Sequence, residues 1–432
     1  MNIFTVLWQW LQTKKLSVVL LMAASLYATV AIAEQPGSEL SLAEAEGIAL
    51  QSDPMLNLID ANAQALDEAA IADGQLPDPK LKFSLFNFPT DTFSRTQEPI
   101  TQLRFGLQQT IPRGDTLALK SKRTSSQASS VRAKNADEEL KLRRDVRKYW
   151  FETWYWIKAE QIVKKDIELF KQFVDITESQ YAAGKQNQQD VLRAELEKGL
   201  LDDRLTHIQQ QQEAARAELS KWIGTESLRI LSVELPVLPA LPTRAEFEAA
   251  LPRHPALRIF SSKIDMNRHS VSIAREAYKP SWTLGVDYGV RDGNNPDGSE
   301  RSDFLAATVV LDLPIFTDKR QDRRLASAQR RASAAQLELD DKYRAMQSML
   351  ARDHVTWTKL SQRLERYRNT LVGQAEANSE ASLLAYQNDA TDFTTLMRAK
   401  ITELNTHLKA LRIHTDYAKA HARLLYLVGE QS

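Results

Sequence analysis

Cysteine is absent from the 432 residues of this sequence. Its absence excludes disulfide bonds, thiolate metal sites, thiol catalysis and a lipid anchor on an N-terminal cysteine. An excess of charge of either sign is also missing, because 56 basic residues balance 56 acidic residues. No bulk charge attracts the chain to nucleic acid, so we expect no nucleic-acid partner.

Enzyme motifs are missing as well. The sequence has no P-loop, no G-x-S-x-G and no H-E-x-x-H, and its seven histidines are scattered without ligand spacing. Met346 and Met349 could suggest copper, because a thioether is a soft ligand, and the aromatic stretch 149–157 could suggest a stacking platform. The methionine pair and the aromatic stretch are both better explained by packing between helices than by a ligand site. We therefore expect no catalytic residue, no cofactor and no metal site.

The N-terminal segment has the features of an export signal. Lys14 and Lys15 precede an apolar run that ends in Ala31-Ile32-Ala33, the small-x-small pattern of signal peptidase sites. We expect residues 1–33 to be a signal peptide that is removed in a Gram-negative envelope. The alternative is an uncleaved anchor, since the run is about as long as a minimal spanning helix.

The rest of the sequence repeats itself at an interval of 201 to 205 residues. The matched pairs are Pro54 and Pro255, Pro79 and Pro280, Pro112 and Pro314, Trp154 and Trp357, Tyr181 and Tyr386, and Gly224 and Gly429. Six landmarks in one order indicate a duplicated unit. We predict a first structural repeat at 34–228, an extended linker at 229–243, rich in proline and leucine, and a second repeat at 244–430.

Each repeat contains two short segments in which apolar and polar residues alternate, the pattern of a two-faced β-hairpin. The residues that we assign to the apolar face are Leu103, Phe105, Leu107, Trp282, Leu284, Val286, Val309 and Leu311. Four strands are too few for one chain to close a spanning barrel, which needs at least eight. Either the strands pack inside a soluble domain or several chains pool them.

A very long helix follows each hairpin, from about Asp115 to Tyr181 and from Asp318 to Tyr386, with no proline inside. Some 66 residues give a length on the order of 100 Å, which exceeds any single globular core. Apolar residues follow a four-three alternation from Met346 to Leu371, interrupted only at Asp353. Each long helix must therefore pack against other long helices. An ordinary coiled-coil scaffold would explain the helices and leave the hairpins unexplained.

A related stretch occurs where each long helix is expected to reverse: "YAAGKQNQQDVLRA" at 181–194 and "YQNDATDFTTLMRA" at 386–399. Gly184 permits the left-handed conformation that a reversal needs, and Asn388-Asp389 can supply it in the second copy. We expect Asp190 and Asp392 to be the N-caps of the returning helices.

In this arrangement the sequence resembles the TolC-like outer-membrane efflux channels. The resemblance rests on "LPDPKL" before the first hairpin, on "TIPRGD" and "DLPIFTDKR" after the hairpins, and on the two Y-x11-R-A turns. It implies a mainly α fold with a small β part, in which long antiparallel helices form a periplasmic tunnel. It also implies a homotrimer whose twelve pooled strands form a barrel in outer-membrane lipid.

The resemblance further implies a passive channel of a tripartite pump, with a periplasmic membrane-fusion adaptor and an inner-membrane RND-type transporter as partners. The hairpin exits and the second turn look most like the subfamily that serves heavy-metal efflux, with metal cations as substrate. The alternatives are a periplasmic coiled-coil adaptor or scaffold, or a TolC-like channel that serves drug efflux or type I protein secretion. An adaptor should carry β-rich domains at the ends of a single helical hairpin.

By the same resemblance, the second turn would belong to the periplasmic aperture. Tyr386 falls on the gating tyrosine of the family, whereas Thr391 and Thr395 occupy positions where an Arg and an Asp are typical. The residues that we assign to the aperture are Tyr181, Asp190, Tyr386, Asp389, Asp392 and Arg398. We expect Asp389 and Asp392 to form acidic rings that favour cations. The alternative is that both serve only the turn and the N-cap.

Overall fold

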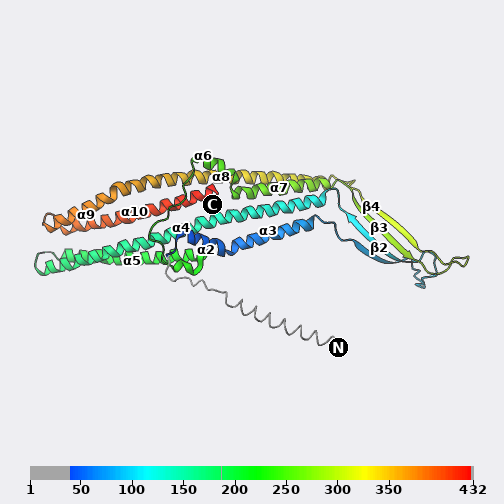
Figure 1. The fold of residues 1–432 in the computed structure, drawn as a ribbon, viewed down its shortest axis with the longest axis horizontal. Helices are drawn as coiled ribbons and strands as arrows, with labels where there is room; N and C mark the ends of the chain where they lie inside the picture. Colours follow the sequence, from blue (N-terminus) through cyan, green and yellow to red (C-terminus); the bar gives the residue numbers. More distant parts are fainter. Residues whose placement is uncertain (1–38, 186, 430–432) are drawn as a thin grey trace, which may run out of the picture.

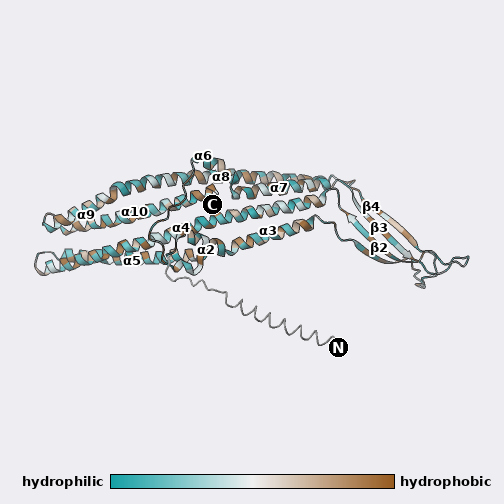
Figure 2. Cartoon of the chain, viewed as in Figure 1, coloured by the Kyte–Doolittle hydropathy of each residue, from teal (hydrophilic) through white to brown (hydrophobic). Residues whose placement is uncertain are grey.

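The computed structural model describes residues 39–185 and 187–429, so the predicted signal peptide at 1–33 lies outside the described residues. The chain is elongated, with long helices that reverse at one end and a sheet at the other (Figure 1). Hydrophilic and hydrophobic residues are interspersed along the helices (Figure 2). In the described part, no helix combines the length and the apolar character needed to cross a bilayer.

The order of elements is the same in the two halves of the chain. The first half contains α2 (Leu42–Ser52), α3 (Pro54–Asp73), β1 (Lys80–Phe86), β2 (Gln102–Ile111), α4 (Thr116–Ala182) and α5 (Gln188–Ile223). The second contains α6 (Arg244–Ala250), α7 (Pro255–Glu276), β3 (Ser281–Val290), β4 (Phe304–Asp312), α8 (Gln321–Arg366), α9 (Val372–Gln387) and α10 (Phe393–Val428). Between the two halves, residues 229–243 form no helix and are largely extended.

Side-chain caps fix where several helices begin. The Asp53 carboxylate accepts hydrogen bonds from the backbone N–H groups of Met55 and Leu56 at the start of α3. Thr243 and Glu246 form a reciprocal capping box at the start of α6. These caps satisfy backbone donors that have no partner within the helix, so the breaks in the helices follow directly from the local sequence.

α4 is the central element of the fold. Its 67 residues span on the order of 100 Å. It packs against α3 and α7 on the side of the sheet, and against α5 and α10 toward the reversing turns. The aromatic stretch at 149–157 supplies core residues, since Trp150 and Phe151 are fully buried. Met346 on α8 is also buried, at 2% exposure, which agrees with packing of the heptad pattern.

The sequence predicted one continuous helix from Asp318 to Tyr386, but the structure shows that this helix is interrupted. A π-helical segment, Tyr367–Leu371, separates α8 from α9. The interval between matched residues grows from 203 at Trp154 and Trp357 to 205 at Tyr181 and Tyr386. A π-turn accommodates an inserted residue within a helix without breaking it, which gives a physical reason for the interruption.

The four strands form one antiparallel sheet in the order β1-β2-β3-β4. The two hairpins are joined by the pairing of β2 with β3, in which Leu107 lies opposite Val286. Each edge strand pairs on one side only within the chain. The fold is therefore mainly helical with a small β part, as predicted.

Candidate channel site

The register of the sheet places all eight predicted apolar residues on one face. Leu107 lies opposite Val286, and Leu284 lies opposite Val309, so their side chains share that face. Val286 is 54% exposed and Leu107 is 57% exposed, although both are large apolar side chains. The same face continues onto β1 through Phe83, which packs on Phe105 at 5.2 Å between ring centroids.

One polar residue that the sequence analysis did not consider also lies on this face. Gln109 lies opposite Leu284, between two apolar neighbours of its own strand. Its side-chain amide donates a hydrogen bond of 2.9 Å to the carbonyl of Pro77. The amide is thus partly satisfied by the chain itself at the helix-side end of the sheet.

The opposite face of the sheet carries mostly small and polar residues, with Phe86, Phe304 and Val310 as its large apolar ones. Gly106 lies opposite Asp287, whose carboxylate fills the space that a Cβ on Gly106 would occupy. Gly285 lies between Gln108 and Thr308, and a Cβ there would meet only ordinary van der Waals contacts, the nearest at 3.8 Å. A sheet with one exposed apolar face and one polar face can separate lipid from water.

The two reversing turns lie together at the end of the molecule opposite the sheet (Figure 1). Gly184 has φ of +71° and Asp389 has φ of +54°. The prediction of a left-handed residue in each turn is confirmed. Asp389 is exposed and its side chain has no hydrogen bond within residues 39–185 and 187–429.

Asp392 is the N-cap of α10, as predicted. Its carboxylate accepts a hydrogen bond of 2.7 Å from the backbone N–H of Thr395. This hydrogen bond lowers the pKa of Asp392, with smaller contributions from the positive charges of Arg398 and Arg193. Arg398 is exposed, and its effect on Asp392 indicates that the two predicted site residues lie near each other.

The prediction for Asp190 is wrong. The N-cap of α5 is Asn187, and Asp190 lies inside the first turn of the helix. Asn187 lies six residues after Tyr181, just as Asp392 lies six residues after Tyr386, so the N-cap has the same place in both copies. Asp190 corresponds to Thr395 in the second copy, three residues past the cap. An acidic residue in the first turn still interacts favourably with the helix dipole.

The two matched tyrosines have different surroundings. The Tyr386 hydroxyl donates a hydrogen bond of 3.0 Å to the side-chain carbonyl of Gln180, and its ring lies 5.8 Å from that of Phe393. Tyr181 is 48% exposed. Within residues 39–185 and 187–429, the hydroxyl of Tyr386 thus ties the end of α9 to the end of α4, whereas that of Tyr181 makes no hydrogen bond.

Sequence reasoning missed the role of Arg193. Its guanidinium extends from α5 to the Thr394 hydroxyl of α10, at 3.3 Å, and its Nε is buried with no hydrogen-bond partner in the described part of the chain. Arg193 is the arginine of the first Y-x11-R-A turn, at the position equivalent to Arg398. The repeat was thus the signal that could have identified it.

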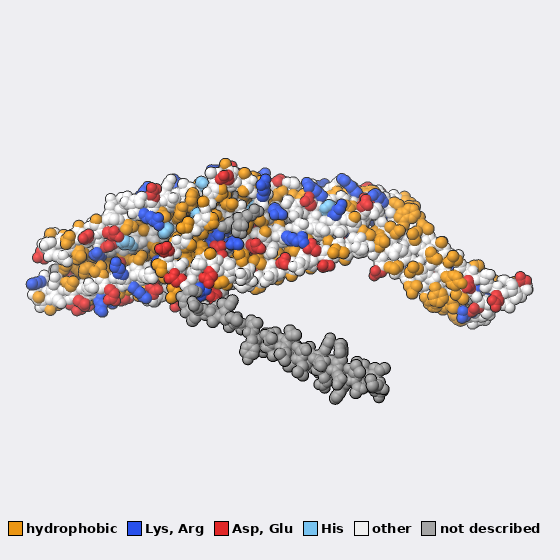
Figure 3. All heavy atoms as spheres, viewed as in Figure 1, with side chains coloured by type: hydrophobic (Ala, Val, Ile, Leu, Met, Phe, Trp, Pro, Cys, Tyr) orange, Lys and Arg blue, Asp and Glu red, His pale blue; other side chains and the backbone are white. Residues whose placement is uncertain are grey.

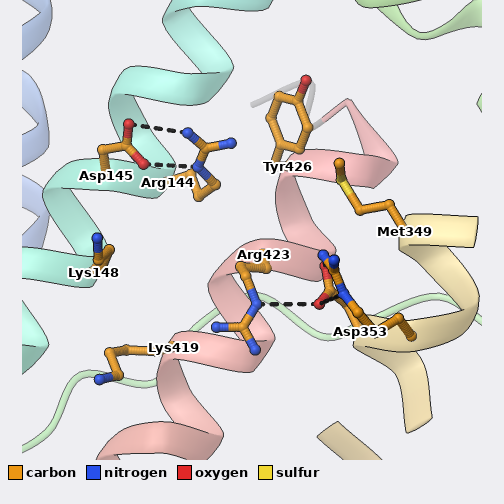
Figure 4. Close-up of a pocket in the computed structure, with 9 residues that line it drawn as sticks. Arg144, Asp145, Lys148, Met349, Asp353, Lys419, Arg423 and Tyr426 are labelled. Carbon is orange, nitrogen blue, oxygen red and sulfur yellow. Dashed lines mark hydrogen bonds and ion pairs between the residues drawn. The ribbon is translucent and has the colours of Figure 1, made fainter. Parts of the chain in front are cut away.

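A pocket of about 330 Å³ lies midway along the helices (Figure 4). Its lining consists of Arg144, Asp145 and Lys148 from α4, Met349, Arg352 and Asp353 from α8, and Lys419, Arg423 and Tyr426 from α10. Asp353, the polar interruption of the heptad pattern, is buried and pairs with Arg423 at 3.3 Å. Asp353 also pairs with Arg352 of its own helix at 3.3 Å. Its pair with Arg423 links α8 to α10, and removing Asp353 would leave both cations without this carboxylate.

Glu152 lies beside this pocket and binds two cations. Its carboxylate pairs with Arg412 and with Lys419, each at 2.6 Å. Burial alone would raise the pKa of Glu152, but the hydrogen bonds from Arg412 and Lys419 lower it below its usual value. The carboxylate of Glu152 and the positive charges of Arg412 and Lys419 thus stabilise one another. Within residues 39–185 and 187–429, no group of three or more His, Asp or Glu side chains is placed to hold a metal ion.

Several solved structures of outer-membrane proteins resemble this fold. The outer-membrane channel OprN is 16% identical, with 90% of each chain covered and a TM-score of 0.75. The outer membrane protein VceC from the bacterial pathogen Vibrio cholerae is 17% identical over 90% of this chain and 96% of that chain, with a TM-score of 0.73. CusC, whose structures concern folding and transmembrane channel formation, is 15% identical over 92% and 94%, also at 0.73. No protein-family profile and no curated protein sequence matches the chain.

These likenesses establish the fold. The chain shares its architecture, long helices with one four-stranded sheet, with these outer-membrane proteins.

Proposed function

We propose that this chain is the outer-membrane channel of a tripartite efflux pump and that it works as a homotrimer. Three copies would pool twelve strands into a barrel in the outer membrane, and their helices would continue as a tunnel into the periplasm. A periplasmic adaptor and an inner-membrane transporter would supply the substrate and the energy. The channel would have no enzymatic activity.

The observation that carries this proposal is the sheet itself. Its apolar face is exposed, with Phe83 at 62% and Leu305 at 75%, and both edge strands have a free side within the chain. An apolar sheet with open edges is unstable in water, because its backbone groups and apolar surface invite association. Pairing β4 of one copy with β1 of the next would close the barrel and remove both edges.

The helical part also has a surface that suits a second copy. Leu192, Leu196 and Leu200 on α5 are spaced by four residues and are between 54% and 62% exposed. This spacing places them along one side of the helix. In a trimer, the apolar stripe would pack against the next subunit and continue the tunnel wall.

The proposal can be tested by cross-linking, because a chain without cysteine gives no background. Cysteine introduced at Leu81, Phe83 or Leu85 in β1 would be combined with Ala307→Cys in β4, and the variants oxidised in isolated membranes. At least one pair should give covalent dimers and trimers. The matched control joins Leu85→Cys with Leu103→Cys, which are paired within one sheet and should close inside one chain. Monomers alone from all three test pairs would contradict the trimeric barrel.

Fractionation tests the location and separates the channel from an adaptor or scaffold. A channel should stay with outer membranes after a high-salt wash and should require detergent for extraction. Recovery in the soluble periplasmic fraction would contradict the proposal.

For the substrate, we propose metal cations. The proposal is supported by the resemblance of "DLPIFTDKR" and of the second turn to heavy-metal efflux channels, and by the exposed Asp389 and Asp392 in that turn. A deletion strain should become sensitive to metal salts. Sensitivity to drugs alone would indicate that drugs are the substrate, and loss of a protein from the medium would indicate protein secretion. Either result would contradict metal cations as the substrate.

A further inference from the structure

A groove lies where the sheet passes into the helices, between α4, α7 and the beginning of α8. Its volume is about 640 Å³. Apolar and small residues of α7, among them Ile273 and Ala274, form its floor. Its charged residues are all basic: Arg123, Lys319, Arg320, Arg323, Arg324 and Arg331. We call this feature the junction groove.

The cations of the junction groove have no acidic partners. No acidic residue lines the groove, and none of the six cations forms an ion pair within residues 39–185 and 187–429. Two nearby carboxylates have other partners: Asp322 accepts a hydrogen bond from the Tyr278 hydroxyl, and Glu276 pairs with Lys279. Asp318, next to Lys319, is exposed and forms no ion pair within the described residues. By contrast, Arg423 in the pocket midway along the molecule is paired with Asp353.

Apolar residues adjoin the groove on the side of the sheet. Between β4 and α8, Ile315 is 71% exposed and Phe316 is 84% exposed. The sequence thus changes within a few residues from exposed apolar side chains to the basic start of α8. Figure 3 shows Lys and Arg side chains along this part of α8, next to hydrophobic side chains over the beginning of the sheet.

We propose that the junction groove binds the phosphate headgroup of an anionic phospholipid in the periplasmic leaflet of the outer membrane. This inference rests on the proposed function, which places the apolar face of the sheet in lipid. Phe316 and Ile315 would then lie at the hydrocarbon boundary, and the basic residues would lie at the level of the headgroups. Clustered Arg side chains suit this ligand, because guanidinium groups bind phosphate oxygens in a bidentate manner and basic clusters attract anionic lipids.

The test uses the purified full-length trimer in a mild, uncharged detergent. Binding of phosphatidylglycerol would be measured by native mass spectrometry and by the shift in melting temperature, with phosphatidylcholine and inorganic phosphate as comparison ligands. We expect phosphatidylglycerol to bind and to stabilise the trimer, and phosphatidylcholine to have no such effect. Raising the salt concentration should weaken binding, because exposed charges are screened.

A triple variant, Arg320→Gln with Arg323→Gln and Arg324→Gln, should bind phosphatidylglycerol at least about tenfold more weakly. The matched control removes three exposed cations far from the groove, through Lys165→Gln, Lys171→Gln and Arg366→Gln, and should bind as the wild type does. If the triple variant does not assemble, the corresponding Arg→Lys variant keeps the charge but loses the bidentate geometry, so it should bind phosphatidylglycerol measurably more weakly than the wild type. Binding equal to that of the wild type would contradict recognition by the guanidinium groups. If the control variant loses as much affinity for phosphatidylglycerol, net charge alone controls binding, and the assignment of the junction groove as the site is wrong.

Other outcomes would also overturn the proposal. Binding of phosphatidylcholine as strong as that of phosphatidylglycerol would exclude headgroup recognition. Competition by millimolar inorganic phosphate, with no stabilisation by lipid, would indicate a site for free phosphate. Failure of the proposed function can be distinguished from failure of this inference. A protein that is not found in outer membranes and does not conduct ions would contradict the proposed function before any lipid is added.

Discussion

The Tyr386 hydroxyl donates a hydrogen bond of 3.0 Å to the side chain of Gln180, joining residues that are 206 positions apart in the sequence. This contact holds the end of α9 against the end of α4, next to the two reversing turns. A single neutral hydrogen bond contributes about 0.5–1.5 kcal/mol, so its loss should loosen this end of the molecule without unfolding it.

Tyr386→Phe should therefore raise the conductance of the trimer in planar bilayers and leave its melting temperature nearly unchanged. The ring of Phe at this position can still pack on Phe393. Tyr181→Phe is the matched control, because the Tyr181 hydroxyl makes no hydrogen bond in the described part of the chain. The same increase in both variants would show that the contact with Gln180 does not restrain the aperture.

Leu284 and Gly285 are neighbours on β3 that point to opposite faces of the sheet. If the apolar face meets lipid in a trimer, as we propose, Leu284→Arg should block assembly of the membrane-inserted trimer, since an arginine in lipid costs roughly 2–4 kcal/mol per chain at the bilayer midplane. Gly285→Arg should be better tolerated, because this position lies on the more polar face and a Cβ there clashes with no neighbour. The measurement is the amount of trimer in outer membranes. Equal losses would contradict the assignment of the faces.

His254 gives the fold a dependence on pH. It is buried at 2% exposure and caps α7, with Nδ1 accepting from the Ala256 N–H and Nε2 lying 2.7 Å from the Tyr426 carbonyl. This pattern requires a neutral ring that donates through Nε2. Burial lowers the pKa of His254 below its usual value, and the hydrogen bond to Tyr426 offsets only part of that effect.

A base with a lowered pKa in the folded state binds more protons when unfolded. Stability from His254 is therefore present above the unfolded pKa of about 6.5 and falls as the pH drops below it. His254→Asn keeps a capping side chain and removes the titration. It should be less stable by about 1 kcal/mol at pH 8, from the lost hydrogen bond. The gap in melting temperature should narrow toward pH 5, and a constant gap would contradict this account.

The periodicity of apolar residues was enough to predict the faces of the strands and the long helices. Alternation in the strands placed Leu103 and Val309 on the same face, although 206 residues separate them in the sequence, and the register of the sheet agrees. Such patterns are readable because a strand has a period of two and a mistake of one residue would reverse its faces. The apolar heptads likewise predicted long helices that pack together.

Features that depend on one inserted residue or on a distant partner could not be read in this way. The π-turn at Tyr367–Leu371 leaves no mark in the residue composition, and Asn187 caps α5 although Asp190, three residues later, is also of a type that caps helices. The contacts of Arg193 with Thr394 and of Tyr386 with Gln180 depend on how the two halves meet. Local sequence does not encode that arrangement.

Asp389 and Asp392 allow a test of the aperture that spares the fold. Asp389 has a positive φ, which Asn adopts as readily as Asp, and Asp392 caps α10 through a hydrogen bond that an Asn side chain can also accept. Replacing both by Asn therefore removes two charges per chain and keeps the turn. If threefold symmetry presents these carboxylates as rings at the mouth of the tunnel, they favour cations by their charge.

The double variant Asp389→Asn with Asp392→Asn should show weaker cation selectivity in planar bilayers, measured as the reversal potential in a salt gradient. Its melting temperature should be nearly unchanged, because capping is retained. The matched control is Asp340→Asn with Asp341→Asn on α8, which removes the same charge from exposed positions away from the turns. Selectivity that survives the first double replacement would assign Asp389 and Asp392 to the turn and the N-cap alone. A loss of selectivity as large in the control would assign the effect to overall charge.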